Sequence, residues 1–493
     1  NGLVDYIFTD PPYDSAIQYG ELCYLWVAWL KMDKSYLQTM CENEVIHNKR
    51  QNKDFEVYHS MLKSSFKCMY DVLQENGYLT VTFHNPTFKV RNATIRAGIA
   101  AGFDFRNIHH QELARSSPKS LLQPFGSAQG DFYLRFHKSD SAKVKKYEEI
   151  DEERFDKIVF ETTKEILAER WEPTPFAIIN NAIDPKIAEY GYFSSLHTGL
   201  DVKTVLKNHL DFELTLVEEK VGGAKGKLWW FKDPSIIPHH DIPLSERVEK
   251  TILRELKENY KVTFTDIWRK IGEEFPNSLT SDKTRIDETL KEYATPISKG
   301  YWALKPIVKQ RVEQHSEMIS KLAEVGQARG FSVWVGVAEQ PKYYISPVGS
   351  AKTLLRTYCK PTKLLLKDLE PKHLRKIKNI DLIWYKNNKI HSTFEIEHTT
   401  MLTEAIERCS NIPYKNKRYI VIPEERENKL LSKLDSPMFR DRFKNDNWEI
   451  LYYDALRVNY NNLLQRKVEI ENIVNKKITK TKGTGGQQMI LTI

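Results

Sequence analysis

The segment VDYIFTDPPY, residues 4–13, joins a short apolar run to a stiff polar turn. An apolar run of this length that stops at Pro11 and Pro12 is typical of a buried β-strand that ends in a turn. Proline fixes φ at about −65° and has no amide hydrogen, so the turn is rigid and its carbonyl oxygens remain available as acceptors. The segment therefore predicts a strand followed at once by a site where Asp10 and Tyr13 present polar groups.

Strands and helices alternate beyond this segment. The expected elements are helices over residues 55–75 and 91–101 and strands over residues 78–83 and 131–136. Such an alternation predicts a largely parallel α/β sheet. The charged stretch over residues 138–153 reads as a linker, so we expect the first domain to cover residues 1–140.

The four residues of the turn supply the groups that methylation of a nucleobase amine requires. The base must leave the helix, its amino hydrogens must be accepted by oxygens, and its ring must lie against an aromatic face. The Asp10 carboxylate and the Pro11 carbonyl can accept the hydrogens, and Tyr13 can stack on the base. Asp10-Pro11-Pro12-Tyr13 closely resembles the D-P-P-Y motif of the S-adenosylmethionine-dependent N6-adenine and N4-cytosine DNA methyltransferases, in which the motif follows the fourth strand of a Rossmann-like sheet. The alternative is a structural turn in which Tyr13 only packs.

Two later segments extend this resemblance over about residues 1–137. GYLTVTFHN at residues 77–85 and AGF at residues 101–103 resemble segments that follow D-P-P-Y in a branch of the family with large C-terminal additions. The resemblance implies a Rossmann-like methyltransferase part, S-adenosylmethionine as cofactor and double-stranded DNA as substrate. The Asp form of the motif is commonest among adenine enzymes, so adenine N6 is favoured over cytosine N4 as the target.

The glycine-rich F-x-G-x-G loop with which these enzymes hold the cofactor has no counterpart in the sequence. Gly222, Gly223 and Gly226 lie between two expected strands, which is typical of a hairpin and not of a strand-to-helix loop. Because the family places the loop before D-P-P-Y, we expect the cofactor half upstream of Asn1 and the chain to be the C-terminal part of a longer enzyme. The cofactor-binding residues therefore stay unknown.

Residues 152–305 repeat a pattern of helices followed by an aromatic strand pair, first in residues 152–235 and again in residues 244–306. Both units resemble winged helices, a fold that commonly lays one helix in the major groove of DNA. Basic residues lie near the expected recognition helix of the second unit: Arg269, Lys270, Lys283 and Arg285. A structural or protein-binding role for these two winged-helix-like units stays open beside DNA contact.

A second candidate site lies in residues 307–460, where the expected order is helix, three strands, helix, strand. Asp381 begins one strand, and Glu395 and Glu397 share one face of the next, so hairpin pairing can bring the three carboxylates together. Carboxylates on one sheet edge can hold Mg²⁺, here with Asp381 and Glu395 as ligands, and activate water for phosphodiester cleavage.

This arrangement resembles the PD-(D/E)XK nuclease superfamily, and FEIEHT at residues 394–399 is similar to its restriction-type members. Two positions depart from the signature, because Glu397 takes the place of the Lys and Ile380 that of the Pro. The resemblance implies a restriction-endonuclease-like α/β domain in which Asp381, Glu395 and Glu397 form the site. A solvated strand of alternating Glu and apolar residues, or the same fold without activity, are the alternatives.

The composition fits a soluble, modular chain. Its 493 residues suggest about three or four domains. Charged residues make up 28%, hydrophobic residues 41%, and no apolar run reaches the roughly 18 residues that span a bilayer. The net charge of +8 fits a polyanionic partner without requiring one. The five cysteines form no C-x-x-C pair, so we expect buried thiols in a reducing cytoplasm.

The sequence as a whole predicts a multidomain α/β protein of a restriction-modification or phage-defence type. It would join a partial methyltransferase, two winged-helix-like units, a nuclease-like domain and a basic, frayed tail over residues 461–493. Other restriction or defence subunits are candidate partners, and no membrane is. The alternative is a non-catalytic DNA-binding or assembly subunit in which both catalytic folds are vestigial.

Overall fold

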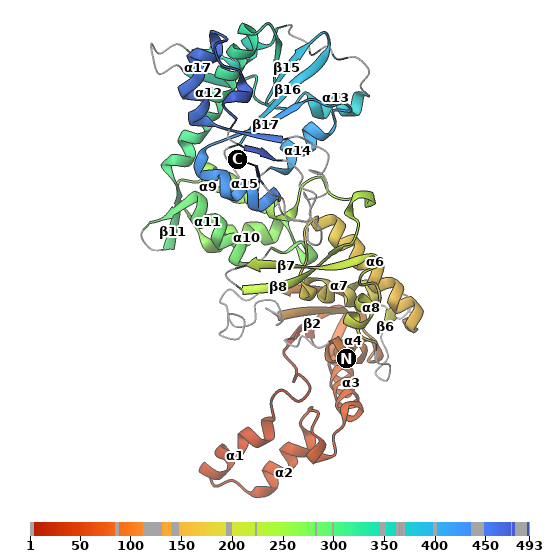
Figure 1. Ribbon diagram of the computed structural model, residues 1–493. Coiled ribbons are helices and arrows are strands. Elements are labelled where there is room, and N and C mark those ends of the chain that lie inside the picture. Colours follow the sequence, from red (N-terminus) through yellow and green to blue (C-terminus); the bar gives the residue numbers. More distant parts are fainter. Residues whose placement is uncertain are drawn as a thin grey trace. The chain divides into compact units, whose positions relative to one another are not determined.

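The chain forms two compact units in a computed structural model (Figure 1). The described residues are 4–83, 88–111, 131–139, 147–193, 200–221, 224–281, 283–297, 300–345, 352–360, 364, 366, 370–397, 402–434, 448–474, 476–478 and 491–492. Unit 1 comprises Asn1–Ala168, Pro173–Asp233 and Pro276–Thr280, and unit 2 comprises Glu169–Glu172, Pro234–Phe275 and Ser281–Ile493. The domain limits expected from the sequence, at residues 140, 235 and 306, stay predictions.

A four-stranded sheet forms the first part of unit 1. Its strands are β1 (Val4–Thr9), β2 (Leu73–Phe83), β3 (Asp104–Gln111) and β4 (Asp131–His137), in the order β1-β2-β4-β3. Strand β1 pairs parallel with β2, whereas β4 pairs antiparallel with both β2 and β3. The expectation of a largely parallel sheet is therefore wrong, because the pairings of β4 with β2 and with β3 are antiparallel. β1, β2 and β3 run in one direction, but β4 inserts between β2 and β3 and reverses the ladder.

Helices α3 (Phe55–Val72) and α4 (Phe88–Ala100) pack into the core of this sheet. Tyr58, Leu62 and Phe66 recur every four residues on α3, so they form one apolar stripe, and all three are buried. Asp54 accepts a hydrogen bond from the amide of Val57 and caps the helix. Cys68 lies off the stripe and is exposed, which corrects the expectation that the cysteines are buried thiols; Cys359 and Cys409 are buried.

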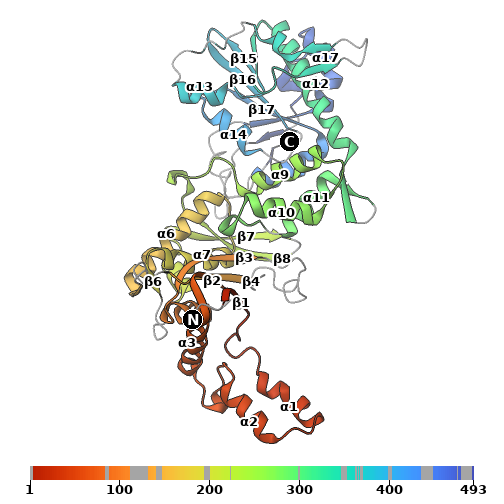
Figure 2. The same ribbon diagram turned by 180° about the vertical axis from the view of Figure 1, so that it is seen from behind.

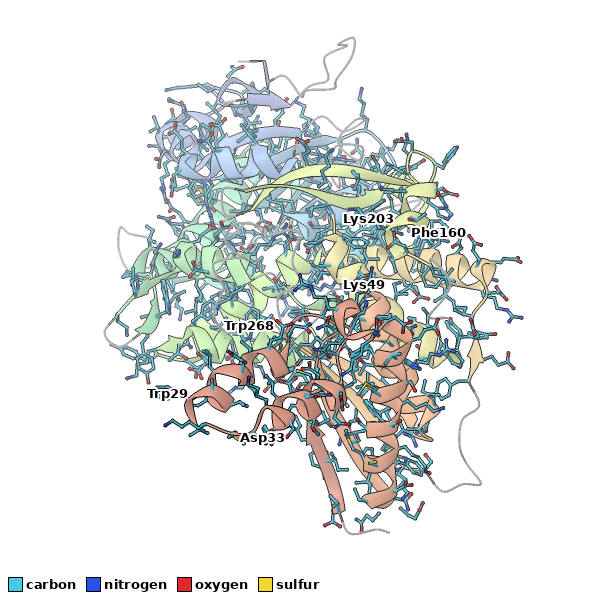
Figure 3. The ribbon with its side chains drawn as sticks, turned by 90° about the horizontal axis from the view of Figure 1, so that it is seen from below. Trp29, Asp33, Lys49, Phe160, Lys203 and Trp268 are labelled. Carbon is cyan, nitrogen blue, oxygen red and sulfur yellow. The ribbon has the colours of Figure 1, made fainter. Side chains whose placement is uncertain are left out.

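Two helices lie between the Asp10 turn and α3: α1 (Tyr19–Trp29) and α2 (Lys34–Asn43). Several large apolar side chains of α1 are exposed: Leu22, Tyr24, Leu25, Trp26 and Trp29. Figure 3 shows Trp29 at the end of α1 and Asp33 just before α2, where the Asp33 carboxylate accepts a hydrogen bond from the amide of Ser35. This part of the chain was not recognised in the sequence as a separate helical segment.

The rest of unit 1 contains α6 (Glu152–Arg170), α7 (Phe176–Glu189), α8 (Val202–Asn208) and a hairpin of β7 (Leu214–Val221) and β8 (Ala224–Phe231). The expected hairpin is confirmed, although its turn at residues 222–223 lies outside the described residues. Arg91 of α4 forms a buried ion pair with Asp184 of α7 and donates to the Asn180 carbonyl at 3.1 Å. This pair fixes α7 against the four-stranded part of the unit.

Unit 2 begins with a small helical and strand-containing segment. Its elements are α9 (Leu244–Glu258), β9 (Val262–Thr263), α10 (Phe264–Glu274), α11 (Lys283–Tyr293), β10 (Ala294–Pro296) and β11 (Tyr301–Leu304), with the sheet order β10-β11-β9. The winged-helix assignment stays a prediction. Arg269 is exposed. Arg285 lies 3.5 Å from the buried carboxylate of Glu172, so it pairs with a carboxylate inside the unit.

The C-terminal region is built on a mixed sheet with the order β12-β15-β16-β17-β18-β19-β20. Its elements include α12 (Pro306–Ala328), β12 (Ser332–Val335), β15 (Leu382–Lys386), β16 (Lys389–Ile396), α14 (Thr403–Ser410), β17 (Lys417–Ile422), α15 (Glu427–Leu434), β18 (Trp448–Tyr452) and α17 (Tyr453–Leu464). The expected order of helix, three strands, helix, strand is confirmed. Figures 1 and 2 show α12 and α17 together on one side of this sheet, and α13 (Pro371–Ile377) and α14 on the other.

Gly326 sets the distance between α12 and β15. A Cβ at this position would lie 2.4 Å from Trp384 Nε1. The indole nitrogen of Trp384 in turn donates to the Leu322 carbonyl at 3.0 Å. Close approach of the helix to the strand is therefore possible only without a side chain at this position, and it brings the buried face of α12 over the sheet.

Two features of this region depart from the expectations. A hairpin of β13 (Tyr343–Ile345) and β14 (Lys352–Leu354) is inserted after β12. Residues 461–493 are not a frayed tail throughout, because β19 (Lys476–Ile478) and β20 (Leu491–Thr492) extend the sheet from β18. An edge strand offers unpaired backbone groups that such a segment can satisfy. Among the described helices, none has the length and apolar content needed to cross a membrane.

Candidate functional site

The Asp10 turn leaves the end of β1 and is held by α3. Asp10 is exposed, Pro11 is buried, and the Tyr58 hydroxyl donates a 2.8 Å hydrogen bond to the Pro12 carbonyl. Burial raises the pKa of Tyr58 to about 12, so this donor keeps its proton. Asp10 and Tyr13 thus stand on a turn whose backbone is anchored from the core.

The Tyr13 side chain contacts the protein through both its ring and its hydroxyl. The ring packs edge-on against Phe83, with 5.1 Å between centroids and 81° between planes. The hydroxyl hydrogen-bonds to the Asp10 carboxylate. Next to it, Asp14 adopts a left-handed backbone conformation with φ 55°, and its carboxylate lies 2.9 Å from His47 Nδ1. His47 was not singled out in the sequence, because nothing in its local pattern pointed to the turn.

The second candidate site lies where β15 begins and β16 ends. The Asp381 carboxylate accepts a 2.9 Å hydrogen bond from the amide of Ile396, so it lies beside the strand that carries Glu395 and leads to Glu397. All three carboxylate residues are buried, with exposed fractions of 7%, 0% and 9% for Asp381, Glu395 and Glu397. The alternative of a solvated strand of alternating glutamates therefore does not describe these residues.

Three side chains not assigned to the site from the sequence join this cluster. His315 of α12 places Nε2 3.4 Å from Asp381 and Nδ1 3.4 Å from Glu339, which follows β12. Arg408 of α14 donates to Glu395 through Nε at 3.1 Å and through Nη2 at 2.6 Å. We call these six residues the carboxylate cluster: His315, Glu339, Asp381, Glu395, Glu397 and Arg408.

One comparison with known proteins covers the region that holds this cluster. Residues 301–480 match the family model of the type II restriction enzyme NmeDI C-terminal domain. The matched span starts with β11, just before α12, and contains every residue of the carboxylate cluster. The C-terminal part of the chain thus has a restriction-modification context.

The other comparisons add less. No curated protein sequence matches the chain. A solved structure described as a DNA modification methylase from Thermus thermophilus aligns at 12% identity, over 39% of this chain and 79% of that chain, with a TM-score of 0.17. A score of this size supports no statement about the fold.

The carboxylate cluster holds more buried carboxyl groups than cations. Burial raises the pKa of Glu395 to about 8, although Arg408 opposes the shift. Burial, together with the charge of Asp381, also raises the pKa of Glu397 well above its usual range. Burial acts in the same sense on Asp381, but His315 and Arg408 outweigh it and lower its pKa to about 2. Ionising every carboxylate therefore needs a further cation.

The donor set of the domain fits a divalent metal ion. His315, Glu339 and Asp381 each offer one ligand atom, and these atoms lie within 4.8 Å of one another. Among the described residues, these three side chains form a group that could hold a metal ion. Glu339 Oε2 is buried and lies 3.4 Å from His315 Nδ1, whereas Oε1 lies 2.7 Å from Lys342 Nζ. Carboxylate oxygens gathered within this distance are the ligands that a hard cation such as Mg²⁺ takes.

His315 acts as an internal counter-ion for two of these carboxylates. Burial alone would lower the pKa of His315, but its contacts with Asp381 and Glu339 raise it to about 10, so without a metal ion the ring is an imidazolium at neutral pH, and it can become a metal ligand only by losing a proton. The sequence held a signal for this residue. His315 is the ionisable member of an otherwise apolar stripe on the long helix, with Val308, Val312, Ile319 and Leu322. Glu339 had no such signal.

We predict that raising the pH destabilises the protein when no divalent metal is present. Unfolded Glu titrates at about 4.3, so between that pH and about 8 folded Glu395 keeps a proton that the unfolded chain has lost. The free energy of unfolding should then fall by up to about 1.4 kcal/mol per pH unit over this range. His315, with its pKa raised to about 10, contributes in the same direction above its unfolded pKa of about 6.5.

Denaturant unfolding at pH 6 and pH 8 with a metal chelator measures this slope. Glu395→Gln should flatten it, and Mg²⁺ should restore stability at pH 8. The exposed Glu370→Gln serves as the matched control and should leave the slope unchanged. Equal slopes in the wild type and Glu395→Gln would contradict the role of this carboxyl.

Proposed function

We propose that the chain is a restriction-modification enzyme that acts on DNA through two centres. Its C-terminal domain is a metal-dependent endonuclease, and its N-terminal part contributes to a DNA methyltransferase of exocyclic amines, with adenine N6 the favoured target. The observation that carries the proposal is the buried carboxylate cluster inside residues that match a type II restriction enzyme domain.

For the endonuclease, Asp381 and Glu395 are the metal ligands, and Glu339 adds a third carboxylate, with a ligand atom within 4.8 Å of one on Asp381. Bound Mg²⁺ supplies Lewis-acid activation of water and neutralises charge on the phosphate. The residues of the chain fix the geometry: the Ile396 amide orients Asp381, and β15 and β16 hold Asp381 and Glu395 on adjacent strands. The order of elements supports a PD-(D/E)XK-like domain with Glu397 in the Lys position.

For the methyltransferase, Asp10 and Pro11 are the acceptors for the target amine and Tyr13 is the stacking face, on the turn that Pro11 and Pro12 stiffen. The turn lies beyond the carboxyl end of β1, which pairs parallel with β2, and open α/β sheets bind their ligands at such ends. The described residues fit a base and contain no glycine-rich strand-to-helix loop for S-adenosylmethionine. We therefore assign no cofactor-binding residue and no step to the cofactor.

Double-stranded DNA is the proposed partner of both centres. The chain carries a net charge of +8, and Arg269 of α10 is exposed in the second winged-helix-like segment. Phosphate contacts of such cations provide affinity that falls steeply with salt. Other restriction or defence subunits are further candidate partners.

Two observations favour a second candidate function, a non-catalytic DNA-binding or assembly subunit. Arg408 donates to both oxygens of Glu395, and the Tyr13 hydroxyl is bonded to Asp10, so one proposed catalytic carboxyl group in each centre already has a protein partner. The two functions differ in one experiment. Plasmid DNA incubated with the full chain should show strand breaks in Mg²⁺ or Mn²⁺ and none with a chelator. DNA binding without breaks in either metal would select the non-catalytic subunit.

A further inference from the structure

We infer that Arg408 supplies, from helix α14, the positive charge that the nuclease centre lacks at position 397, and that Arg408 and the divalent metal alternate as the partner of the Glu395 carboxyl group. The inference rests on the proposed endonuclease function and concerns the same site. It adds a residue that contacts the phosphate and a reason why a glutamate is tolerated at position 397.

Arg408 lies within ion-pair distance of both proposed metal ligands. Its Nε and Nη2 donate to the two oxygens of Glu395 at 3.1 and 2.6 Å, and Nη2 lies 3.8 Å from Asp381 Oδ1. The Glu395 side chain is fully buried, whereas one fifth of the Arg408 side chain is exposed. The guanidinium therefore bridges the buried carboxylates and the solvent side of the cluster.

The helix that carries Arg408 is anchored at its first residue. Thr403 donates to the buried Glu246 carboxylate through its hydroxyl at 2.8 Å and through its amide at 3.3 Å. At the other end, Cys409 Sγ lies 3.6 Å from Glu395 Oε1. With α14 held at both points, the Arg408 side chain has a defined starting position above Asp381 and Glu395.

Metal and guanidinium compete for Glu395. A carboxylate whose two oxygens both accept from Arg408 must give up at least one of these bonds to take a metal ion. The guanidinium cannot lose its proton at neutral pH, so a displaced Arg408 keeps its charge and its forked donors beside the metal site. A phosphate oxygen is the acceptor whose geometry matches that fork.

The role of Arg408 in hydrolysis is to stabilise charge without exchanging a proton. The water oxygen forms a bond to phosphorus, and the bond from phosphorus to the leaving sugar oxygen breaks. The proton of the attacking water passes to solvent through a neighbouring carboxylate, and the leaving oxygen takes a proton from solvent water. The guanidinium donates to a non-bridging phosphate oxygen, whose negative charge grows in the transition state.

The test compares Arg408→Met and Arg408→Lys with Arg457→Met in the full chain. Arg457 is the matched control, because its guanidinium also donates two hydrogen bonds to a glutamate of the same region. Its Nε lies 3.2 Å and its Nη2 2.7 Å from the carboxylate oxygens of Glu317. Two quantities are measured: the cleavage rate at saturating Mg²⁺, and Mg²⁺ affinity by calorimetry without DNA.

Arg408→Met should lower the cleavage rate by about 100-fold and should tighten Mg²⁺ binding several-fold, because the competing cation is gone. Arg408→Lys should keep more of the rate than Arg408→Met, since it retains a charge. Arg457→Met should change neither quantity beyond its effect on folding. If Arg408 only supported the structure, its substitution would not tighten Mg²⁺ binding while lowering the cleavage rate.

Three results would overturn the inference: an unchanged rate in Arg408→Met, a parallel loss of rate and Mg²⁺ affinity, or equal rates in Arg408→Lys and Arg408→Met. If circular dichroism shows Arg408→Met unfolded, Arg408→Lys decides alone, and a rate as low as that of Asp381→Ala counts against the inference. Failure of the proposed function has a different signature, in which the wild type binds Mg²⁺ but cuts no DNA.

Discussion

Asp381→Ala should abolish metal-dependent cutting of DNA, lowering the rate by about 1,000-fold or more. Asp381 is the carboxylate of the cluster with the most strongly lowered pKa, about 2, so it stays ionised at every pH where the protein works and is the first ligand a metal meets. Loss of the metal forfeits several kcal/mol of transition-state stabilisation, and about 1.4 kcal/mol corresponds to a factor of ten in rate.

The measurement is the rate of strand breakage in plasmid DNA at saturating Mg²⁺, with Mg²⁺ affinity by calorimetry beside it. Asp454→Ala is the matched control, because Asp454 lies on α17 of the same domain with an exposed side chain. Asp381→Asn tests charge separately from shape and should fail to cut as well. If Asp381→Ala cuts DNA at the wild-type rate, the nuclease centre does not depend on Asp381 and lies elsewhere.

In a form of the protein that also carries the cofactor-binding loop, Asp10→Ala and Tyr13→Ala should each abolish or nearly abolish methyl transfer to DNA while leaving the protein folded. Asp10 is exposed at the end of β1, so its loss removes an acceptor for the target amine and little packing. Tyr13→Ala removes a stacking face worth about 1 to 3 kcal/mol and its contact with Phe83. Tyr13→Phe keeps the ring and loses only the bond to Asp10, so it should retain more activity.

Methyl incorporation from labelled S-adenosylmethionine measures transfer. A 2-aminopurine placed at the target position reports base extrusion by fluorescence and needs no transfer. The exposed Asp71→Ala on α3 and Tyr36→Ala on α2 are the matched controls. Should Asp10→Ala and Tyr13→Ala leave both readouts unchanged, the segment is a structural turn and the methyltransferase proposal fails.

Local sequence patterns predicted the elements that carry both sites. The apolar run before Asp10 forms β1, and the hairpin expected around Asp381 and Glu395 forms β15 and β16. These successes share a cause, since strand periodicity and turn residues are properties of neighbouring positions. Arrangements that depend on distant partners were missed. The insertion of β4 between β2 and β3 is one, and the pairing of β19 with β18 is another.

The candidate site shows the same division at the level of side chains. Asp381 and Glu395 lie on paired strands, so a hairpin was enough to predict their proximity. Arg408 reaches Glu395 from α14 and Glu339 reaches the cluster from the segment after β12, and no periodicity links either position to the hairpin. Sequence reasoning found Glu397 in the place of the Lys, whereas the fold brings Arg408 and His315 to the cluster from two helices.

The buried hydrogen bonds of Glu246 join α14 to a helix that precedes the matched region. The match to the restriction-enzyme domain starts at residue 301, yet the first residue of α14 is capped by a side chain of α9, which lies upstream of that border. Arg426 of the domain likewise pairs with Glu292 of α11. A gene fragment cut at the family border would expose a helix end and a guanidinium that are satisfied only by the preceding segment. The matched region therefore depends on the segment before it, and any exchange of that segment by recombination must preserve a glutamate in the place of Glu246.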